Sequence, residues 1–260
     1  CTTGASYSVA IGNSALGSNQ TGDTRNVAVG YQALFANTTG TNNVAVGMQA
    51  FDGSTTASNC TAVGQAALGG SNTGDFNVAV GTASLPSNTS GANNTALGTY
   101  ALYTNSTASN NTAVGKSALQ LNTTGGNNVA IGESALDANL TGAGNIGIGV
   151  HALGANTSPN YNTGVGYYAL KTNVTGSNNA AVGANALTNN STGLANVALG
   201  YAALQNNTTA SYNTALGNAS MITNTTGSQN CAIGHDSLKY NTQGHYNIAI
   251  GSNTMAANTT

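Results

Sequence analysis

Charged side chains are scarce in this sequence. Only 4% of its 260 residues are Asp, Glu, Lys or Arg, whereas about 25% is usual in soluble proteins. Six acidic and four basic residues give a net charge of -2 and form no basic stripe. Such a stripe would be needed to neutralise nucleic-acid phosphates or anionic lipids. Nucleic acids and membrane surfaces are therefore not expected as partners.

Long apolar runs are missing too. No stretch approaches the roughly 20 apolar residues of a membrane helix, and the N-terminus lacks the charged and apolar regions of a signal peptide. We therefore expect no membrane insertion. Because the chain begins at Cys1 rather than Met, export is not excluded, and a processed product or fragment is expected.

Groups suited to catalysis or metal binding are sparse. His151, His235 and His245 are far apart in the sequence, and the six carboxylates form no local pair for acid-base chemistry. His235 and Asp236 are adjacent, so in an extended segment their side chains should point apart. No Cys/His cluster with metal-ligand spacing and no Asp-rich calcium turn is present. We expect no enzyme, no cofactor and no metal site.

One five-residue motif returns throughout the chain. It reads Asn-(Val/Thr)-Ala-(Val/Ile/Leu)-Gly, or a near copy. With its Asn as position 1, copies begin every 17 residues from Asn26 to Asn247. A further, slightly longer copy begins at Ser8, which makes 15 copies, the last cut short at Thr260. A fixed period of this length predicts a solenoid or array.

The repeat is poor helix material, because each copy carries Gly, β-branched residues and a turn resembling Asn-Thr-Thr-Gly. It predicts an all-β, parallel β-solenoid (β-roll) of about 15 coils of 17 residues. We expect a first strand at about positions 1 to 4, a second at positions 8 to 12, and turns at position 5 and positions 13 to 15. Position 5 is always Gly, as expected where the backbone needs a positive φ or close approach.

Two columns of the repeat are large and apolar. Position 4 is always Val, Ile or Leu, and position 9 is Leu except at Phe51, Met221 and Met255. We expect both columns to point inward and form the core. Positions 3 and 8 hold only small residues, although in a strand they should face the opposite way. A solvated face would not impose that restriction.

The small residues at positions 3 and 8 therefore predict a close contact with a partner. Two large apolar residues per coil also bury too little area to offset the entropy of ordering 17 residues. We expect a parallel homo-oligomer with positions 3 and 8 at the contact. Glutamate at Ala113, Ala130 and Ala181 should then separate the chains or prevent folding.

Asparagine occupies positions 1 and 12 in almost every copy. Stacked amides can hydrogen-bond along a column, so these columns predict structural ladders. Position 12 fails only at Ser54 and Ser71. Its main members are Asn37, Asn88, Asn105, Asn122, Asn139, Asn156, Asn173, Asn190, Asn207 and Asn224.

Most position-12 asparagines also form Asn-x-Thr/Ser sequons, which would be glycan acceptors in a eukaryotic secreted protein. An ice-binding face would need threonines alternating along one flat strand. Here the threonines at positions 13 and 14 are adjacent, so their side chains should diverge.

Three cysteines are present: Cys1, Cys60 and Cys231. Cys60 and Cys231 lie ten repeats apart, too far for a disulfide within one solenoid. We expect both to be small buried side chains, and Cys1 leaves open a bond between chains.

Tyrosines gather at the variable positions of the repeat, which are expected to face solvent. Tyr100, Tyr103, Tyr167, Tyr168 and Tyr201 are the candidate glycan contacts, through ring stacking and hydrogen bonding. They could equally be ordinary surface residues that favour strands.

The motif Ser-Val-Ala-Ile-Gly at residues 8–12, and its copy at residues 128–132, resemble the head repeats of trimeric autotransporter adhesins. There the motif marks each coil of a left-handed parallel β-roll, but those repeats are shorter, so the resemblance covers the first strand and its turn. The full unit at residues 111–125 is similar to arrays in phage tail-fibre and fibre-like surface proteins. The resemblance implies an elongated, trimeric, extracellular rod used for attachment.

The expected function is thus that of a fibre or adhesin segment on a virion or cell surface, an elongated extracellular rod that attaches to a surface or to a host glycan. A self-assembling extracellular filament without a receptor is the alternative, and an ice-binding solenoid a minor one. Residues 1–7 would be a lead-in and residues 8–260 one continuous array, expected to be a fragment of a longer fibre because neither end is capped.

Overall fold

The structure is a computed structural model that describes residues 7–18 and 24–260. The chain is an all-β, parallel β-solenoid with coils of about 17 residues, as predicted, and the described residues contain no helix. The chain consists of two compact units, Cys1–Asn128 and Val129–Thr260, which are described separately. Cys1 and residues 19–23 lie outside the described part.

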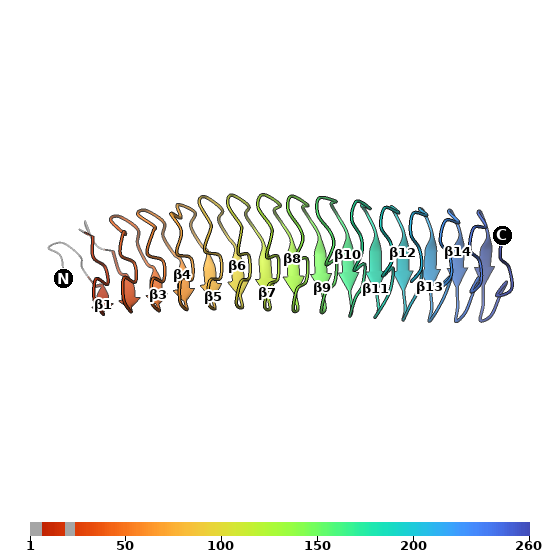
Figure 1. Ribbon diagram of the computed structural model, residues 1–260, viewed down its shortest axis with the longest axis horizontal. Helices are drawn as coiled ribbons and strands as arrows, with labels where there is room; N and C mark the ends of the chain where they lie inside the picture. The colour runs from red at the N-terminus through yellow and green to blue at the C-terminus, as the bar shows by residue number, and fades with distance from the viewer. Residues whose placement is uncertain (1–6, 19–23) are drawn as a thin grey trace. The chain divides into compact units, whose positions relative to one another are not determined.

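Unit 1 contains one short strand per coil, and the strands pair in parallel in sequence order (Figure 1, red to yellow-green). The register is unshifted, so equivalent residues of successive repeats lie side by side. The strands are β1 (Val9–Ile11), β2 (Val27–Val29), β3 (Val44–Val46), β4 (Thr61–Val63), β5 (Val78–Val80), β6 (Thr95–Leu97) and β7 (Thr112–Val114).

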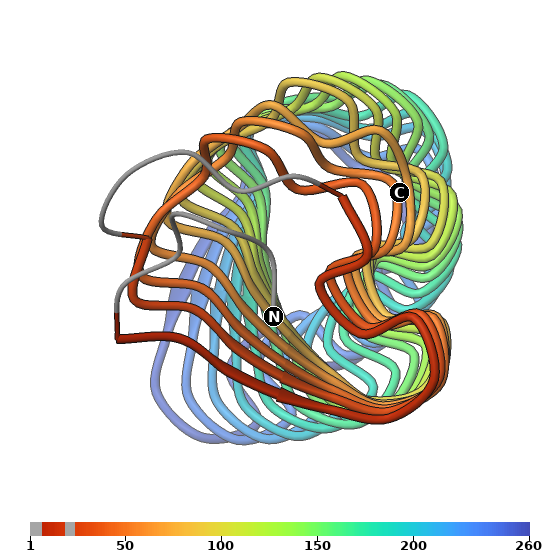
Figure 2. The same ribbon diagram turned by 90° about the vertical axis from the view of Figure 1, so that its left-hand side faces the viewer.

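Unit 2 repeats this arrangement (Figure 1, green to blue). Seen along the stacking direction, the successive coils of each unit overlie one another (Figure 2). Its strands are β8 (Val129–Ile131), β9 (Ile146–Ile148), β10 (Thr163–Val165), β11 (Ala180–Val182), β12 (Val197–Leu199), β13 (Thr214–Leu216), β14 (Cys231–Ile233) and β15 (Ile248–Ile250).

Each strand covers positions 2 to 4 and ends at the glycine of position 5, as expected. Gly98 has a φ of +137°, and a Cβ there would lie 2.6 Å from the carbonyl oxygen of Gly115 in the next coil. Both the backbone angle and the contact exclude other residues. The invariant glycine therefore follows from the distance between stacked coils.

In the part of the chain that the structure describes, positions 8 to 12 form no strand, so the prediction of a second strand there was wrong. This segment is a run of turns in which positions 7 and 9 are left-handed, as at Asn185 (φ +58°) and Leu187 (φ +50°). Hydrogen bonds between coils hold the turns: Leu187 N–H donates to Ala203 O at 3.0 Å. These bonds offset the cost of a left-handed leucine.

The core differs from the predicted one, because positions 3, 8 and 9 point inward. Ala181, Ala186 and Leu187 are fully buried, whereas Val182 at position 4 is 40% exposed. Position 4 was therefore wrongly assigned to the core, and its side chains face outward. Strand alternation then places the small residue of position 3 inside.

The small residues at positions 3 and 8 are thus explained by packing within a coil stack, and not by a partner. Built on Gly147, a Cβ would lie 3.2 Å from Cγ of Leu136, the position-9 leucine of the preceding coil. Built on Gly164, a Cβ would likewise lie 3.2 Å from Cγ of Leu153. Ala113, Ala130 and Ala181 are fully buried, so placing positions 3 and 8 at an oligomer contact was wrong.

Candidate binding surface

The asparagines of position 12 form the predicted amide ladder. Asn190 Nδ2 donates to Asn173 Oδ1 of the preceding coil at 2.9 Å and to Gly193 O of its own turn at 2.9 Å. Asn207 Nδ2 in turn donates to Asn190 Oδ1 at 2.8 Å. Equivalent bonds to the turn carbonyl are made by Asn37, Asn88, Asn105, Asn122, Asn139, Asn156, Asn173, Asn207 and Asn224, all fully buried.

The ladder changes where position 12 is serine. Ser71 is exposed, and its neighbour Asn72 is buried in the amide column. Asn88 Nδ2 donates to Asn72 Oδ1 at 2.6 Å. One coil earlier, the hydroxyl of Ser54 donates to Asn72 O at 2.7 Å. Sequence alignment by position alone missed Asn72, although the shortened turn Asn72-Thr73-Gly74 marks it.

The asparagines of position 1 bond mainly to backbone. Asn179 Oδ1 accepts the N–H of Asn196 in the next coil at 3.0 Å, and Asn179 Nδ2 donates to Gly193 O at 2.9 Å. Asn190 donates to that same carbonyl. Two buried amides thus clamp each turn from both sides.

Cys60 takes the place of a position-1 asparagine. It is buried, and its thiol lies 3.6 Å from Gly74 O, where the amide would donate. Burial raises the pKa of this thiol to about 11. Cys231, by contrast, lies at position 2 of the repeat, at the start of β14, and is half-buried. The prediction that it is buried was therefore only partly right. Both are free thiols.

The adjacent threonines diverge, as expected. Thr208 Oγ1, at position 13, donates to Thr225 O of the next coil at 3.1 Å, and Thr225 Oγ1 donates to Thr242 O at 3.0 Å. At position 14, Thr209 and Thr226 are exposed. The hydroxyls of position 13 therefore hold neighbouring coils together, whereas the threonines of position 14 are exposed.

Any N-glycans on the folded protein should be confined to exposed sequons. Asn122 uses its amide for Asn105 Oδ1 (3.0 Å) and Gly125 O (2.9 Å), so a glycan there would break the ladder and could not fit inside the coil. Asn59, Asn93 and Asn110, at position 17, also head sequons and are exposed.

Peptide mass spectrometry on natively folded protein from a glycosylating host can measure this. We expect occupancy only at sequons of the exposed kind. A glycan on Asn122 in protein that unfolds at the same temperature as unglycosylated material would contradict it.

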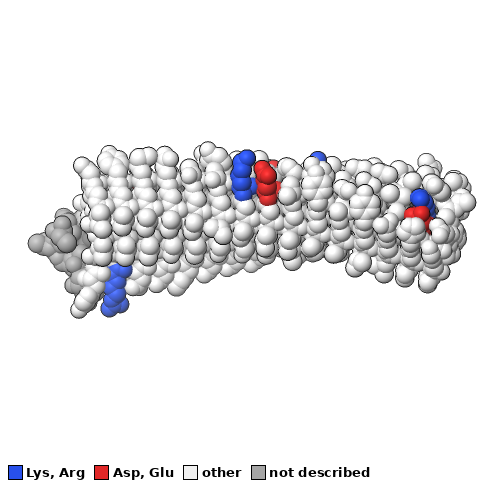
Figure 3. All heavy atoms as spheres, turned by 90° about the horizontal axis from the view of Figure 1, so that it is seen from below, with Lys and Arg blue, Asp and Glu red and all other residues white. Residues whose placement is uncertain are grey.

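The outward residues of positions 2 and 4 form an uncovered strand face in each unit. Leu199 is 52% exposed, while Ala198 between the two columns is 1% exposed. The columns contain only Val, Ile, Leu, Thr, Ala and Cys. Charged side chains are few and scattered on the face that Figure 3 shows. Exposed members include Val9, Ile11, Val46 and Leu97 in unit 1, and Ile131, Ile146, Val182, Val197, Leu199, Ile248 and Ile250 in unit 2.

The five candidate tyrosines fall into two pairs and a single residue. In unit 1, the rings of Tyr100 and Tyr103 meet edge to face with centroids 5.4 Å apart. In unit 2, Tyr167 and Tyr168 stack at 3.8 Å. Tyr201 is 57% exposed and joins neither pair.

Tyr168 collects further groups around it. The His151 ring lies 5.6 Å from the Tyr168 ring, and Lys171 Nζ lies 4.1 Å from its centroid. A hydrogen bond between the two phenols raises the pKa of Tyr167. Burial raises the pKa of Asp137, although the charge of nearby His151 opposes this shift. The sequence did not reveal this cluster, because its members lie at variable positions of the repeat and Tyr167 and Tyr168 would point apart in a strand.

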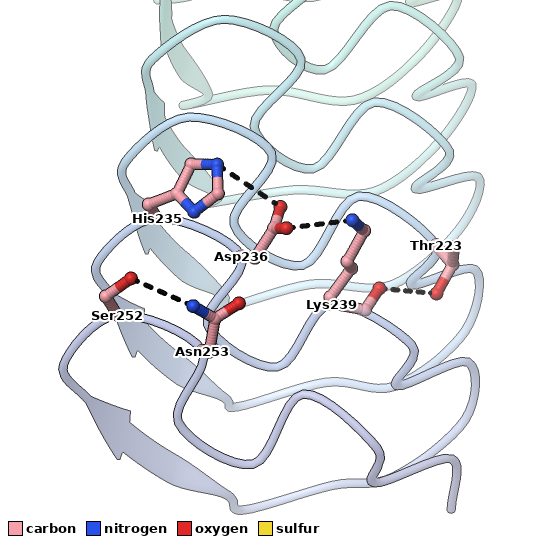
Figure 4. A network of polar contacts seen from close by, with 6 residues as sticks. All are labelled: Thr223, His235, Asp236, Lys239, Ser252 and Asn253. Carbon is pink, nitrogen blue, oxygen red and sulfur yellow. Dashed lines mark hydrogen bonds and ion pairs between the residues drawn. The ribbon is translucent and has the colours of Figure 1, made fainter.

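A second charged cluster lies near the end of unit 2 (Figure 4). Lys239 Nζ pairs with Asp236 Oδ2 at 2.8 Å, and His235 Nε2 lies 3.9 Å from Asp236 Oδ1. The expectation that His235 and Asp236 point apart was wrong, because Asp236 is left-handed (φ +53°), which breaks strand alternation. The hydrogen bond that Lys239 donates to the Asp236 carboxylate raises the pKa of Lys239.

In residues 7–18 and 24–260, three or more His, Cys, Asp or Glu side chains never gather as a metal site would require. Across the same residues, a helix of the length and apolarity needed to cross a membrane is not found. No protein-family model matches the sequence, and no curated protein shows significant similarity to it.

Proposed function

We propose that this chain is a structural segment of an extracellular fibre or adhesin, which holds an attachment surface away from a virion or cell. The observation that carries the proposal is the uncovered apolar strand face on a stack of near-identical coils. The buried amides and the threonine hydroxyls form hydrogen bonds within each coil and between neighbouring coils. These bonds stiffen the stack of coils.

The strand face favours a parallel homo-oligomer, and the fibre-protein resemblance favours a trimer. An apolar face this regular marks an interaction site in a soluble protein. A second copy of the chain offers the same uncharged columns at the same coil spacing. Fully burying one Val, Leu or Ile stabilises by about 1.5–3 kcal/mol, so covering several half-exposed members would contribute on the order of 5–10 kcal/mol before association costs.

Charges on this face should separate the copies without unfolding them. In Val182→Glu/Leu199→Glu, two exposed side chains become anions that a partner would have to desolvate. Sedimentation velocity should show the wild type as an oligomer and the variant as a folded monomer. Thr192→Glu, on an exposed turn residue, is the matched control and should remain oligomeric.

Cys231 provides a second readout of the same face. Its thiol should react slowly with maleimide in the wild-type assembly and quickly in the double variant, while buried Cys60 stays unreactive in both. A monomeric wild type, or a double variant that remains oligomeric, would reject the proposed interface.

The alternative, an extracellular filament without a receptor, is tested separately. A glycan array probed with the purified chain should give reproducible hits if the fibre attaches to carbohydrate. An oligomeric chain without hits would favour the scaffold.

A further inference from the structure

The aromatic cluster of unit 2 suggests what kind of receptor such a fibre would hold. We propose that Tyr167, Tyr168, Lys171 and His151, here called the tyrosine–lysine stack, bind an acidic oligosaccharide. This inference rests on the proposed attachment function and names its ligand class.

Local backbone geometry builds the stack. Tyr168 is left-handed (φ +58°), so two consecutive side chains lie on the same side of the coil instead of alternating. Their rings are 3.8 Å apart and 26° from parallel. Lys171 Nζ lies 4.1 Å from the Tyr168 centroid and must occupy the other face, because the first is already covered by Tyr167. Tyr168 is thus enclosed, and Tyr167, 49% exposed, presents its outer face to solvent.

The charge of the stack favours an anion. Lys171 forms no ion pair within the described part of the chain, whereas the comparable Lys239, 5.5 Å from the Tyr240 centroid, is paired with Asp236 at 2.8 Å. In a sequence with only four lysine and arginine residues, Lys171 lies over the Tyr168 ring, and His151, which is near Asp137, approaches the same ring. The Tyr167 phenol adds a hydroxyl that can donate a hydrogen bond to the ligand.

These groups match two features of an acidic sugar chain. The apolar face of a pyranose ring can stack on the outer face of Tyr167, as sugars do on aromatic side chains. The carboxylate or sulfate of a neighbouring unit can accept hydrogen bonds from the Lys171 ammonium and a phenol hydroxyl. Because the rings of Tyr168 and Tyr167 both lie between the Lys171 ammonium and the free face of Tyr167, a ligand of at least two sugar units fits better than a monosaccharide.

Calorimetric titration of the full chain would use galacturonic acid oligomers and, as the neutral counterpart, galactose oligomers. Lys171→Gln should weaken acidic-oligomer binding roughly tenfold or more, as expected for losing a charged hydrogen bond. Tyr167→Ala should abolish detectable binding. Tyr212→Ala, an exposed tyrosine outside the stack, is the matched control and should bind like the wild type.

Three results would overturn the inference: no binding of the acidic oligomer by the wild type, binding unchanged by both stack variants, or equal affinity for the neutral oligomer. All variants lie at the surface, so unchanged circular dichroism should confirm their folding. A failure here leaves the oligomer measurements untouched, whereas a monomeric wild type that still binds the acidic oligomer would reject the fibre proposal alone.

Discussion

Replacing Ala181 with glutamate should unfold unit 2. Ala181 lies in β11 at position 3 of the repeat, and it is fully buried, on the side of the position-9 leucines. An unpaired carboxylate there costs about 3–5 kcal/mol, and overpacking a tight interior adds about 1–3 kcal/mol. Far-UV circular dichroism should show loss of β structure, and limited proteolysis should cut within residues 129–260.

The neighbouring substitution Val182→Glu is the control. Val182 follows Ala181 in the same strand but is 40% exposed, so its carboxylate stays hydrated and the coil should remain folded. If Ala181→Glu gave a folded monomer and Val182→Glu an unfolded chain, the inward and outward columns would have to be exchanged.

Removing one ladder amide should destabilise unit 2 by about 2–4 kcal/mol, because each buried polar group left unsatisfied costs about 1–3 kcal/mol. In Asn190→Ala, Asn173 Oδ1 loses the donor Asn190 Nδ2, and Asn207 Nδ2 loses one of its two acceptors. Gly193 O keeps only the bond from Asn179. Urea denaturation followed by circular dichroism would measure the change in free energy of unfolding.

Asn189→Ala gives the matched comparison for the ladder. Asn189 is exposed and donates to Asn206 Oδ1 at 3.0 Å, so it makes the same kind of bond in contact with water. We expect a change within about 0.5 kcal/mol, as for most surface substitutions. Equal effects at residues 189 and 190 would mean that burial is not what makes the ladder stabilising.

The stack of coils, the glycine of position 5 and the amide ladder were predictable from the sequence. Each requires one residue type at one place in every coil, so each leaves an unchanging column. Gly98 and Asn190 satisfy requirements set by their own coil and the next one. Such short-range requirements survive in a single sequence.

The direction of each strand face could not be predicted in the same way. Alternation shows only that Ala181 and Val182 point apart, and hydrophobicity favours placing the valine inside. The leucine of position 9 and two asparagine amides are buried in the interior. The space left is narrow, because a Cβ built on Gly147 would lie only 3.2 Å from Cγ of Leu136. The valine is therefore displaced to the surface.

The surface clusters were hidden because turn geometry departs from strand alternation. Tyr167 and Tyr168 would diverge in a strand, and only the left-handed angle at Tyr168 brings their rings together. Lys171 then reaches Tyr168 from three residues further along the turn. Left-handed tyrosine and leucine residues are uncommon enough that propensity argues against them.

The amide hydrogen bonds between coils run in one direction along the chain, and this direction matters during synthesis. Asn207 Nδ2 donates a hydrogen bond to Asn190 Oδ1, and the Asn196 backbone N–H donates one to Asn179 Oδ1. In both columns the donor belongs to the later coil and the acceptor to the earlier coil. During synthesis the N-terminal coil of each such pair is made first. A completed coil therefore presents amide oxygens that can accept hydrogen bonds from the next coil as that coil is synthesised. These oxygens set the register of the next coil before later parts of the chain can compete.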